Sequence, residues 1–132
     1  MLTRITWKMN KHFPDPLIGK FIGKNQWAVL NDFRYHSPKY MTITVPKGFV
    51  SDGASIPSVL WGIIGSPWSG RFPSAAIIHD YLYFSQRFTR AQSDEIFLEG
   101  MQLLGVNLFK RRLMFAAVRV FGWLCWKKRK EK

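Results

Sequence analysis

The stretch Pro73-Ser-Ala-Ala-Ile-Ile-His-Asp-Tyr-Leu-Tyr-Phe84 decides the fold that we expect for this chain. Proline suits the first turn of a helix because it needs no amide partner there, and no helix breaker follows it for several turns. We therefore predict a helix at about residues 73–86. On this helix His79 and Tyr83 are four residues apart and share one face, while Asp80 is turned about 100° away from His79.

Two further helices are predicted towards the C-terminus. Thr89 and Gln92 have the spacing of a capping box, which predicts a second helix that ends at Leu104, before a glycine. Asn107 is suited to cap a third helix over about residues 108–126. Because a short turn joins the first two helices, we expect them to lie antiparallel.

The N-terminal half indicates β structure. Residues 26–35 and 40–45 are rich in β-branched and aromatic side chains, and residues 40–45 alternate in polarity. The segment His36-Ser-Pro-Lys39 between them is typical of a turn, so we predict a hairpin. Pro46 and Gly48 interrupt the second strand, and we expect the sheet to end at about residues 49–53.

This order of elements predicts the α+β class, with a small antiparallel sheet followed by three helices. We interpret residues 1–132 as one domain that is mainly β over 1–50 and loop-rich over 51–72. A short helix is expected after Pro57. The domain is then helical over 73–126 and ends in a basic tail at 127–132.

The composition points to an anionic partner. Twenty Lys and Arg against eight Asp and Glu give a net charge of +12. Such an excess suits an anionic membrane surface, an acidic protein or a nucleic acid, unless it only forms a solvated face. The chain shows no helix-turn-helix, RNP or zinc pattern, which favours the first two partners over nucleic acid.

Cysteine content and the first residues indicate the compartment. Cys125 is the single cysteine, so neither an intramolecular disulfide nor a zinc site built from cysteines is possible. Residues 1–11 mix basic and apolar side chains and contain no continuous apolar segment, so no secretory signal peptide is expected. We therefore expect a reducing compartment.

His79 and Asp94 are the candidate catalytic pair. The second helix carries Asp94 in its first two turns, where its carboxylate can face His79. A carboxylate at one imidazole nitrogen fixes the tautomer and leaves the other nitrogen free to take a proton from water. Asp80 could hold a hard cation such as calcium, which prefers oxygen ligands. The alternative is a structural helix histidine with satisfied hydrogen bonds.

Asp52 is a further candidate metal ligand. With His79, Asp80 and Asp94 it would complete a cluster suited to a divalent metal, as in a metal-dependent phosphohydrolase. The alternative is a turn residue that precedes Gly53.

The third helix is a candidate membrane or partner contact. Residues 113–126 are apolar except for Arg119, but a span across a bilayer needs about 20 residues. An amphipathic helix at the membrane interface is one interpretation, and a core helix with a solvated basic end is the other. The contact residues proposed on the first interpretation are Trp123, Trp126, Lys127, Lys128, Arg129 and Lys130.

Three segments resemble a phage and prophage family catalogued as domain of unknown function 1353. They are Pro46-Lys-Gly-Phe-Val-Ser-Asp-Gly-Ala-Ser-Ile-Pro57, Ala76-Ile-Ile-His-Asp-Tyr-Leu-Tyr83 and Ser93-Asp-Glu-Ile-Phe97. The resemblance covers about Pro46 to Trp123. It implies a viral origin and brings no established activity.

Two helical motifs also resemble phospholipase A2, especially its compact bacterial and viral-capsid forms. His79-Asp-Tyr-Leu-Tyr83 and Asp94-Glu-Ile-Phe97 are similar to its His-Asp-x-x-Tyr and Asp-x-x-Phe helices. The resemblance implies that His79 is the base, Asp80 a calcium ligand, Asp94 the orienter of His79, and Tyr83 a supporting hydroxyl. The calcium loop is not matched closely, although residues 65–70 are rich in glycine and serine.

These observations lead to two main hypotheses. The first is a phage-encoded, cation-dependent ester hydrolase that acts at the host membrane during entry or lysis. The second is a non-catalytic virion or morphogenesis component whose basic surface binds another phage protein; interference with a host defence factor is a further option. The expected location is the virion, the cytoplasm of the infected cell or the inner face of its membrane.

Overall fold

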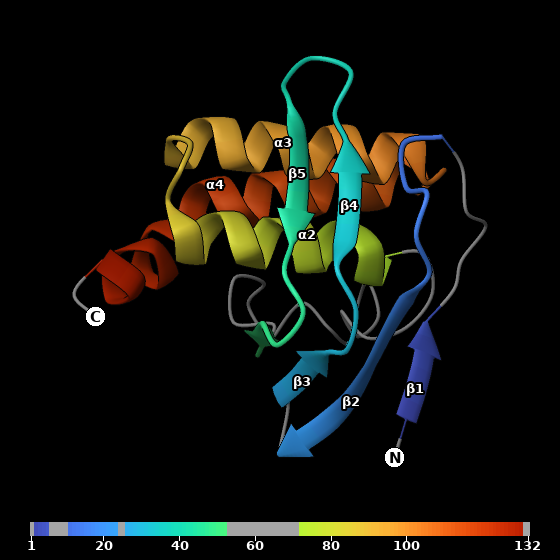
Figure 1. Ribbon diagram of the computed structural model, residues 1–132. Coiled ribbons are helices and arrows are strands. Elements are labelled where there is room, and N and C mark those ends of the chain that lie inside the picture. Colours follow the sequence, from blue (N-terminus) through green and yellow to red (C-terminus); the bar gives the residue numbers. More distant parts are fainter. Residues whose placement is uncertain (1, 6–10, 24–25, 53–71, 131–132) are drawn as a thin grey trace.

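The fold is α+β, as predicted, and six strands precede three helices in the described part of the chain (Figure 1). A computed structural model describes residues 2–5, 11–23, 26–52 and 72–130. The strands are β1 (Leu2–Ile5), β2 (Leu17–Gly23), β3 (Gln26–Val29), β4 (Phe33–His36), β5 (Thr42–Val45) and β6 (Val50–Ser51). The helices are α2 (Phe72–Ser85), α3 (Arg90–Leu103) and α4 (Leu108–Lys130).

The strands form two antiparallel sheets. One has the order β1-β2-β3-β6, and the other is the β4-β5 hairpin, whose register runs from Phe33 opposite Val45 to His36 opposite Thr42. The hairpin was predicted, but the single strand predicted over residues 26–35 is wrong. That segment divides after Val29, so β3 pairs with β2 and β6 while β4 pairs with β5. The expected end of the sheet near residues 49–53 coincides with β6.

A polar corner separates β3 from β4. Asn31 donates a hydrogen bond to the Pro16 carbonyl, at 3.2 Å, and the Asp32 carboxylate accepts one from the Lys47 amide, at 2.9 Å. Asn and Asp favour turns, and these two bonds tie the turn to segments that lie 15 positions away in the sequence. The corner therefore redirects the chain from one sheet to the other.

The helices lie close to their predicted bounds. The capping box at Thr89 forms, with Gln92 N donating to Thr89 Oγ1 at 3.1 Å and Thr89 N donating to Gln92 Oε1 at 2.9 Å. Asn107 caps α4 by accepting a bond from the Lys110 amide at 2.8 Å. The third helix continues beyond Trp126 because Lys and Arg are good helix formers and no breaker follows.

The hairpin is fixed to α3 by two glutamates. Glu99 accepts hydrogen bonds from the hydroxyls of Tyr35 and Ser37, the latter at 2.6 Å. Glu95 accepts one from the Tyr40 hydroxyl at 2.8 Å. These bonds place α3 beside the hairpin.

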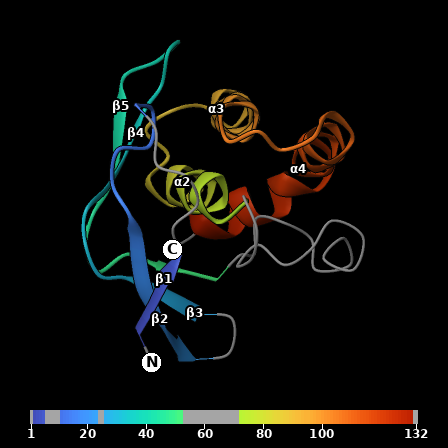
Figure 2. The same cartoon turned by 90° about the vertical axis from the view of Figure 1, so that its right-hand side faces the viewer.

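One hydrophobic core joins the sheets to the helices. Its largest fully buried apolar side chains come from β2, β3, β4, α2 and α3, and α2 is buried along almost its whole length. Figure 2 shows α2 and α3 between the hairpin and α4. These core residues include Trp27, Phe33, Tyr35, Ile77, Ile78, Leu82, Ile96 and Phe97.

None of the described helices is long and apolar enough to cross a membrane. The short helix predicted after Pro57 lies outside the described residues.

Candidate functional site

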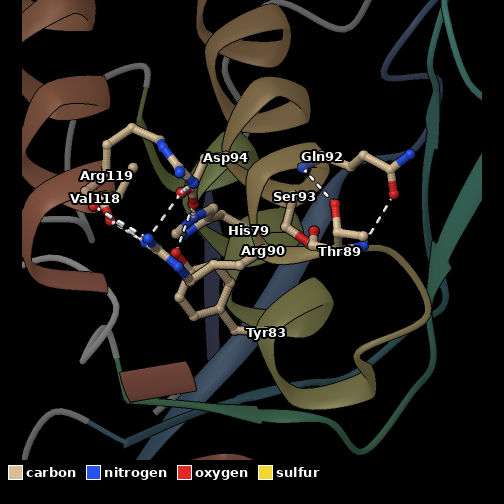
Figure 3. A network of polar contacts seen from close by, with 9 residues as sticks. All are labelled: His79, Tyr83, Thr89, Arg90, Gln92, Ser93, Asp94, Val118 and Arg119. Atoms are coloured by element: carbon tan, nitrogen blue, oxygen red, sulfur yellow. Dashed lines mark hydrogen bonds and ion pairs between the residues drawn. The ribbon is translucent and has the colours of Figure 1, made fainter. Parts of the chain in front are cut away.

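His79 and Asp94 meet between α2 and α3, as predicted (Figure 3). The His79 Nε2 atom lies 2.8 Å from Asp94 Oδ1, and the Tyr83 hydroxyl donates a 2.6 Å hydrogen bond to the same oxygen. The rings of His79 and Tyr83 lie 4.3 Å apart, because their four-residue spacing places them on one face of α2. The structure therefore brings the predicted residues His79, Tyr83 and Asp94 together. The side chains of His79 and Tyr83 both contact the Asp94 carboxylate.

Two arginines approach the other oxygen of Asp94. Arg119 Nη1 lies 2.8 Å from Asp94 Oδ2, and Arg90 Nη1 lies 3.5 Å from it. Sequence reasoning missed both. The four-residue spacing of Arg90 and Asp94 on α3 was a usable signal. The position of Arg119 was also a usable signal, because it is a single base in an apolar helix segment.

Arg90 also ties this network to α4. Its Nη1 donates to the carbonyl oxygens of Val118, at 3.0 Å, and Arg119, at 3.3 Å. Gly122 lies directly against the network, since a Cβ atom there would overlap the Tyr83 hydroxyl. The carboxylate of Asp94 is thus held by groups from α2, α3 and α4 together.

Burial and charge set the ionisation of the network. His79, Asp94 and Tyr83 are all 0% exposed. Burial acts to raise the pKa of Asp94, but hydrogen bonds from His79, Tyr83 and Arg119 outweigh it and hold the pKa below its usual range. Burial, together with the adjacent carboxylate, raises the pKa of Tyr83. At neutral pH Asp94 is therefore a carboxylate and Tyr83 a proton donor.

The second nitrogen of His79 is the atom of the site that lacks a hydrogen bond in the described part of the chain. Its Nδ1 is buried and has no hydrogen-bond partner among the described residues. With Nε2–H donated to the carboxylate, Nδ1 carries the lone pair. Phe97 packs against the imidazole, with ring centroids 4.5 Å apart. The imidazole is thus fixed in orientation by Asp94 and Phe97, while Nδ1 makes no hydrogen bond within the described residues.

Asp80 contacts strand β6, whereas the carboxylate of Asp94 contacts His79. Its Oδ2 accepts a 2.7 Å hydrogen bond from the Ser51 hydroxyl of β6, and both residues are buried. Asp52, which follows Ser51 in the sequence, is exposed. No three His, Cys, Asp or Glu side chains come together as a metal-ligating group within residues 2–5, 11–23, 26–52 and 72–130. The structure therefore does not bring Asp52, His79, Asp80 and Asp94 together as the predicted four-residue cluster.

The chemistry around Asp80 is nevertheless compatible with a hard cation. The Asp80 carboxylate and the Ser51 hydroxyl are oxygen donors of the kind that calcium takes, and they supply two of the roughly six to eight ligands that it needs. The glycine-rich segment 65–70, considered above as a calcium loop, lies outside the described residues.

The predicted contact residues of the third helix differ in their surroundings. The Trp123 side chain is 50% exposed, and Lys127 is also exposed. Trp126 instead packs edge-on against Tyr83, with ring centroids 5.2 Å apart, so it belongs partly to the buried network. The side chains of Lys128, Arg129 and Lys130 lie outside the described residues.

Comparison with known proteins places the chain in a family. Residues 27–118 match the family DUF1353, described as "Protein of unknown function". The chain belongs to this family, as the motifs around His79 and Asp94 predicted.

Two curated relatives come from Sinorhizobium fredii. The uncharacterized protein y4jT is 37% identical over 107 residues, which are 79% of this chain and 32% of that protein. The uncharacterized protein y4iH is 38% identical over 91 residues, which are 69% of this chain and 38% of that protein. The chain thus spans about a third of the length of these relatives. No solved structure shows significant similarity to it.

Proposed function

We propose that this member of the family DUF1353 is an ester hydrolase similar to phospholipase A2, with His79 as its general base. One observation carries the proposal. His79 Nε2 is 2.8 Å from a buried carboxylate, while Nδ1 has no partner among the described residues. This is the arrangement that orients an imidazole and leaves one nitrogen to accept a proton.

The proposed reaction is an ester hydrolysis in two steps. Nδ1 of His79 takes a proton from water, and the water oxygen forms a bond to the ester carbonyl carbon. The tetrahedral oxyanion then collapses, the bond to the alcohol oxygen breaks, and the imidazolium returns its proton to that oxygen. The products are a carboxylic acid and an alcohol, and His79 regains its starting state.

Asp94 and its partners support the base. The Asp94 carboxylate holds the Nε2–H tautomer and stabilises the imidazolium that forms during the first step. Tyr83, Arg90 and Arg119 keep this carboxylate ionised and in place through the contacts described above. We assign these three residues as positioning residues.

Asp80 is proposed to hold a calcium ion, with the Ser51 hydroxyl beside it and exposed Asp52 as a further candidate ligand. When bound, such an ion would polarise the ester carbonyl and offset the charge of the oxyanion. The buried oxygen pair of Asp80 and Ser51 supports this assignment.

We further propose that the substrate is a phospholipid of a host membrane and that the protein is phage-encoded. The net charge of +12 supports an anionic lipid surface as the place of action. The phage origin rests on the motif resemblance described in the sequence analysis.

The test is release of fatty acid from vesicles that contain anionic phospholipid. The wild type is expected to release fatty acid in the presence of calcium and to stop when a chelator is added. His79→Gln should lower the rate by about 10²- to 10⁴-fold, because the general base is lost. His36→Gln is the matched control, since His36 lies on the hairpin, and it should leave the rate unchanged.

Folding is followed by circular dichroism so that loss of structure is not mistaken for loss of chemistry. No release by the wild type with calcium, magnesium or manganese would contradict the hydrolase proposal. If the His79→Gln variant releases fatty acid at the wild-type rate, His79 is not the general base.

A non-catalytic virion or morphogenesis component is the second candidate. Complete burial of His79, Asp80 and Asp94 favours it, because a reacting base must meet its substrate. On this proposal the network is structural and the basic surface binds another phage protein. His79→Gln would then lower stability by about 1–3 kcal/mol through an unpaired buried partner, and the wild type would show no hydrolysis.

A further inference from the structure

Helix α4 presents an apolar face away from the core. The positions that form it recur at three- or four-residue intervals, with Trp123 and Leu124 side by side. The exposed fraction of its large apolar residues ranges from 49% for Leu124 to 70% for Phe109. We call this surface the outer α4 face and define it by Phe109, Arg112, Ala116, Val120, Trp123, Leu124 and Lys127. An apolar strip of this length is unusual on a protein surface and marks an interaction site.

The charge of α4 is entirely positive. Its sequence holds eight Lys and Arg and no Asp or Glu. Exposed Arg112 and Lys127 stand near the two ends of the outer α4 face. At 1.5 Å per residue they are about 22 Å apart along the helix axis. Apolar side chains therefore fill the middle of the strip, and cationic side chains bound it at both ends.

A hollow opens at the N-terminal end of the same face. It has a volume of about 600 Å³ and is lined by Leu108, Phe109, Arg112 and Leu113. Three apolar side chains and one guanidinium suit a molecule with a hydrocarbon chain and an anionic head.

The inner side of α4 is anchored. Met114 and Val118 are buried in the core, and Arg119 is bound to Asp94 on α3. Figure 2 shows α4 on the side of α2 and α3 that is away from the β4-β5 hairpin. The outer α4 face is thus held outwards by the same contacts that build the His79 network.

We infer that the outer α4 face docks on an anionic phospholipid bilayer, with α4 lying in the plane of the interface. The apolar strip enters the boundary between head groups and acyl chains, and Arg112 and Lys127 meet lipid phosphates at its ends. A nucleic acid, or a protein surface that offers acidic groups alone, would satisfy the bases but would leave the apolar strip in water. The inference deepens the proposed function. The biological role of the docking rests on that function, but the docking itself is measured without catalysis.

The experiment is cosedimentation of the full chain with vesicles of phosphatidylcholine, either pure or containing about one-third phosphatidylglycerol. Binding is expected to the anionic vesicles and to fall as salt is added. The double variant Val120→Asp with Trp123→Ser should lose at least about tenfold in affinity, because its apolar contact is removed. Arg112→Gln with Lys127→Gln should lose about thirtyfold in affinity, since each base contributes about 1 kcal/mol at such a surface.

Two controls match these variants. Lys20→Gln with Lys47→Gln removes two exposed bases from the β half, and Met41→Asp places a charge at an exposed apolar residue of the hairpin. Both should bind like the wild type. Equal losses in these controls would show charge attraction without a docking face and would overturn the inference, as would absence of wild-type binding at low salt.

Further outcomes distinguish membrane docking from dimerisation through the same face, and the docking inference from the catalytic proposal. A wild-type dimer in solution that Val120→Asp converts to a monomer would assign the face to a second copy and overturn the inference. His79→Gln should bind vesicles like the wild type. Hydrolysis of a dispersed short-chain ester without vesicle binding would keep the hydrolase and reject the docking face.

Discussion

Helices α2 and α4 invert the usual distribution of residues in opposite ways. Helix α2 is buried along nearly its whole length, yet it carries the ionisable side chains His79 and Asp80 into the core. Helix α4 lies at the outside of the helical layer, yet it exposes Val120 and Trp123. Buried polar groups cost stability unless they are paired, and a strip of exposed apolar groups is a surface that can take a partner.

The difference between the helices lies in how each cost is offset. On α2 the Nε2 atom of His79 and the Tyr83 hydroxyl are paired with Asp94, and two arginines contact the other oxygen of that carboxylate. On α4 nothing in the described part of the chain covers the outer face. Apart from His79 Nδ1, the polar groups of the network are therefore paired within the described residues, whereas the apolar side chains of the outer α4 face have no such partner there.

The largest expected effect comes from removing the centre of the network. Asp94→Ala should lower the free energy of unfolding by about 3–5 kcal/mol, because it leaves His79, Tyr83 and two guanidinium groups without their buried partner. Urea denaturation measures this. Asp15→Ala is the matched control: it breaks an ion pair with Arg34, whose side chain is 48% exposed, and should cost about 1 kcal/mol or less. Equal losses of unfolding free energy in the two variants would show that the Asp94 network stabilises the fold no more than an exposed ion pair does.

The same carboxylate gives the network a pH dependence of known sign. The pKa of Asp94 is lower in the folded protein than the value of about 3.9 for an unfolded chain. Its contribution to stability is therefore full above about pH 4 and is lost as the pH falls through the folded pKa. Urea midpoints between neutral and acid pH should fall less steeply for Asp94→Asn than for the wild type.

An intermediate effect is expected where α4 crosses the network. Gly122→Ala should cost about 1–3 kcal/mol, because the added methyl group would overlap the Tyr83 hydroxyl and force α4 away. The cost should be smaller in a Tyr83→Phe background, where that hydroxyl is absent. Gly100→Ala on α3 is the control, since a methyl group there makes only ordinary contacts of 3.5 Å. If both glycines tolerate alanine equally, α4 does not press on the network as described.

The smallest effect is expected on the outer α4 face. Val120→Asp should change the free energy of unfolding by no more than about 0.5 kcal/mol, because the Val120 side chain is already 59% exposed. Val118→Asp, two residues earlier, places a charge at a fully buried position and should prevent stable folding. Thermal unfolding compares the pair. A large loss in Val120→Asp would show that the face packs within the molecule.

Local signals in the sequence determined the helical half. Proline at the start of α2, the Thr89–Gln92 capping box and Asn107 act within one turn of the chain, so their effect does not depend on the rest of the fold. The contact between His79 and Asp94 could also be expected, because a short turn favours two helices that lie antiparallel as neighbours. The α+β class could be read from the order of these patterns.

Tertiary structure alone decided the features that join distant segments. The division of residues 26–35 between two sheets depends on which strands pair, and a run of β-forming residues does not specify its partner. The bond between Ser51 and Asp80 and the approach of Arg119 to Asp94 join residues 29 and 25 positions apart. Which side of α4 faces outwards was settled in the same way, because an apolar helix segment does not reveal which of its faces the core will cover.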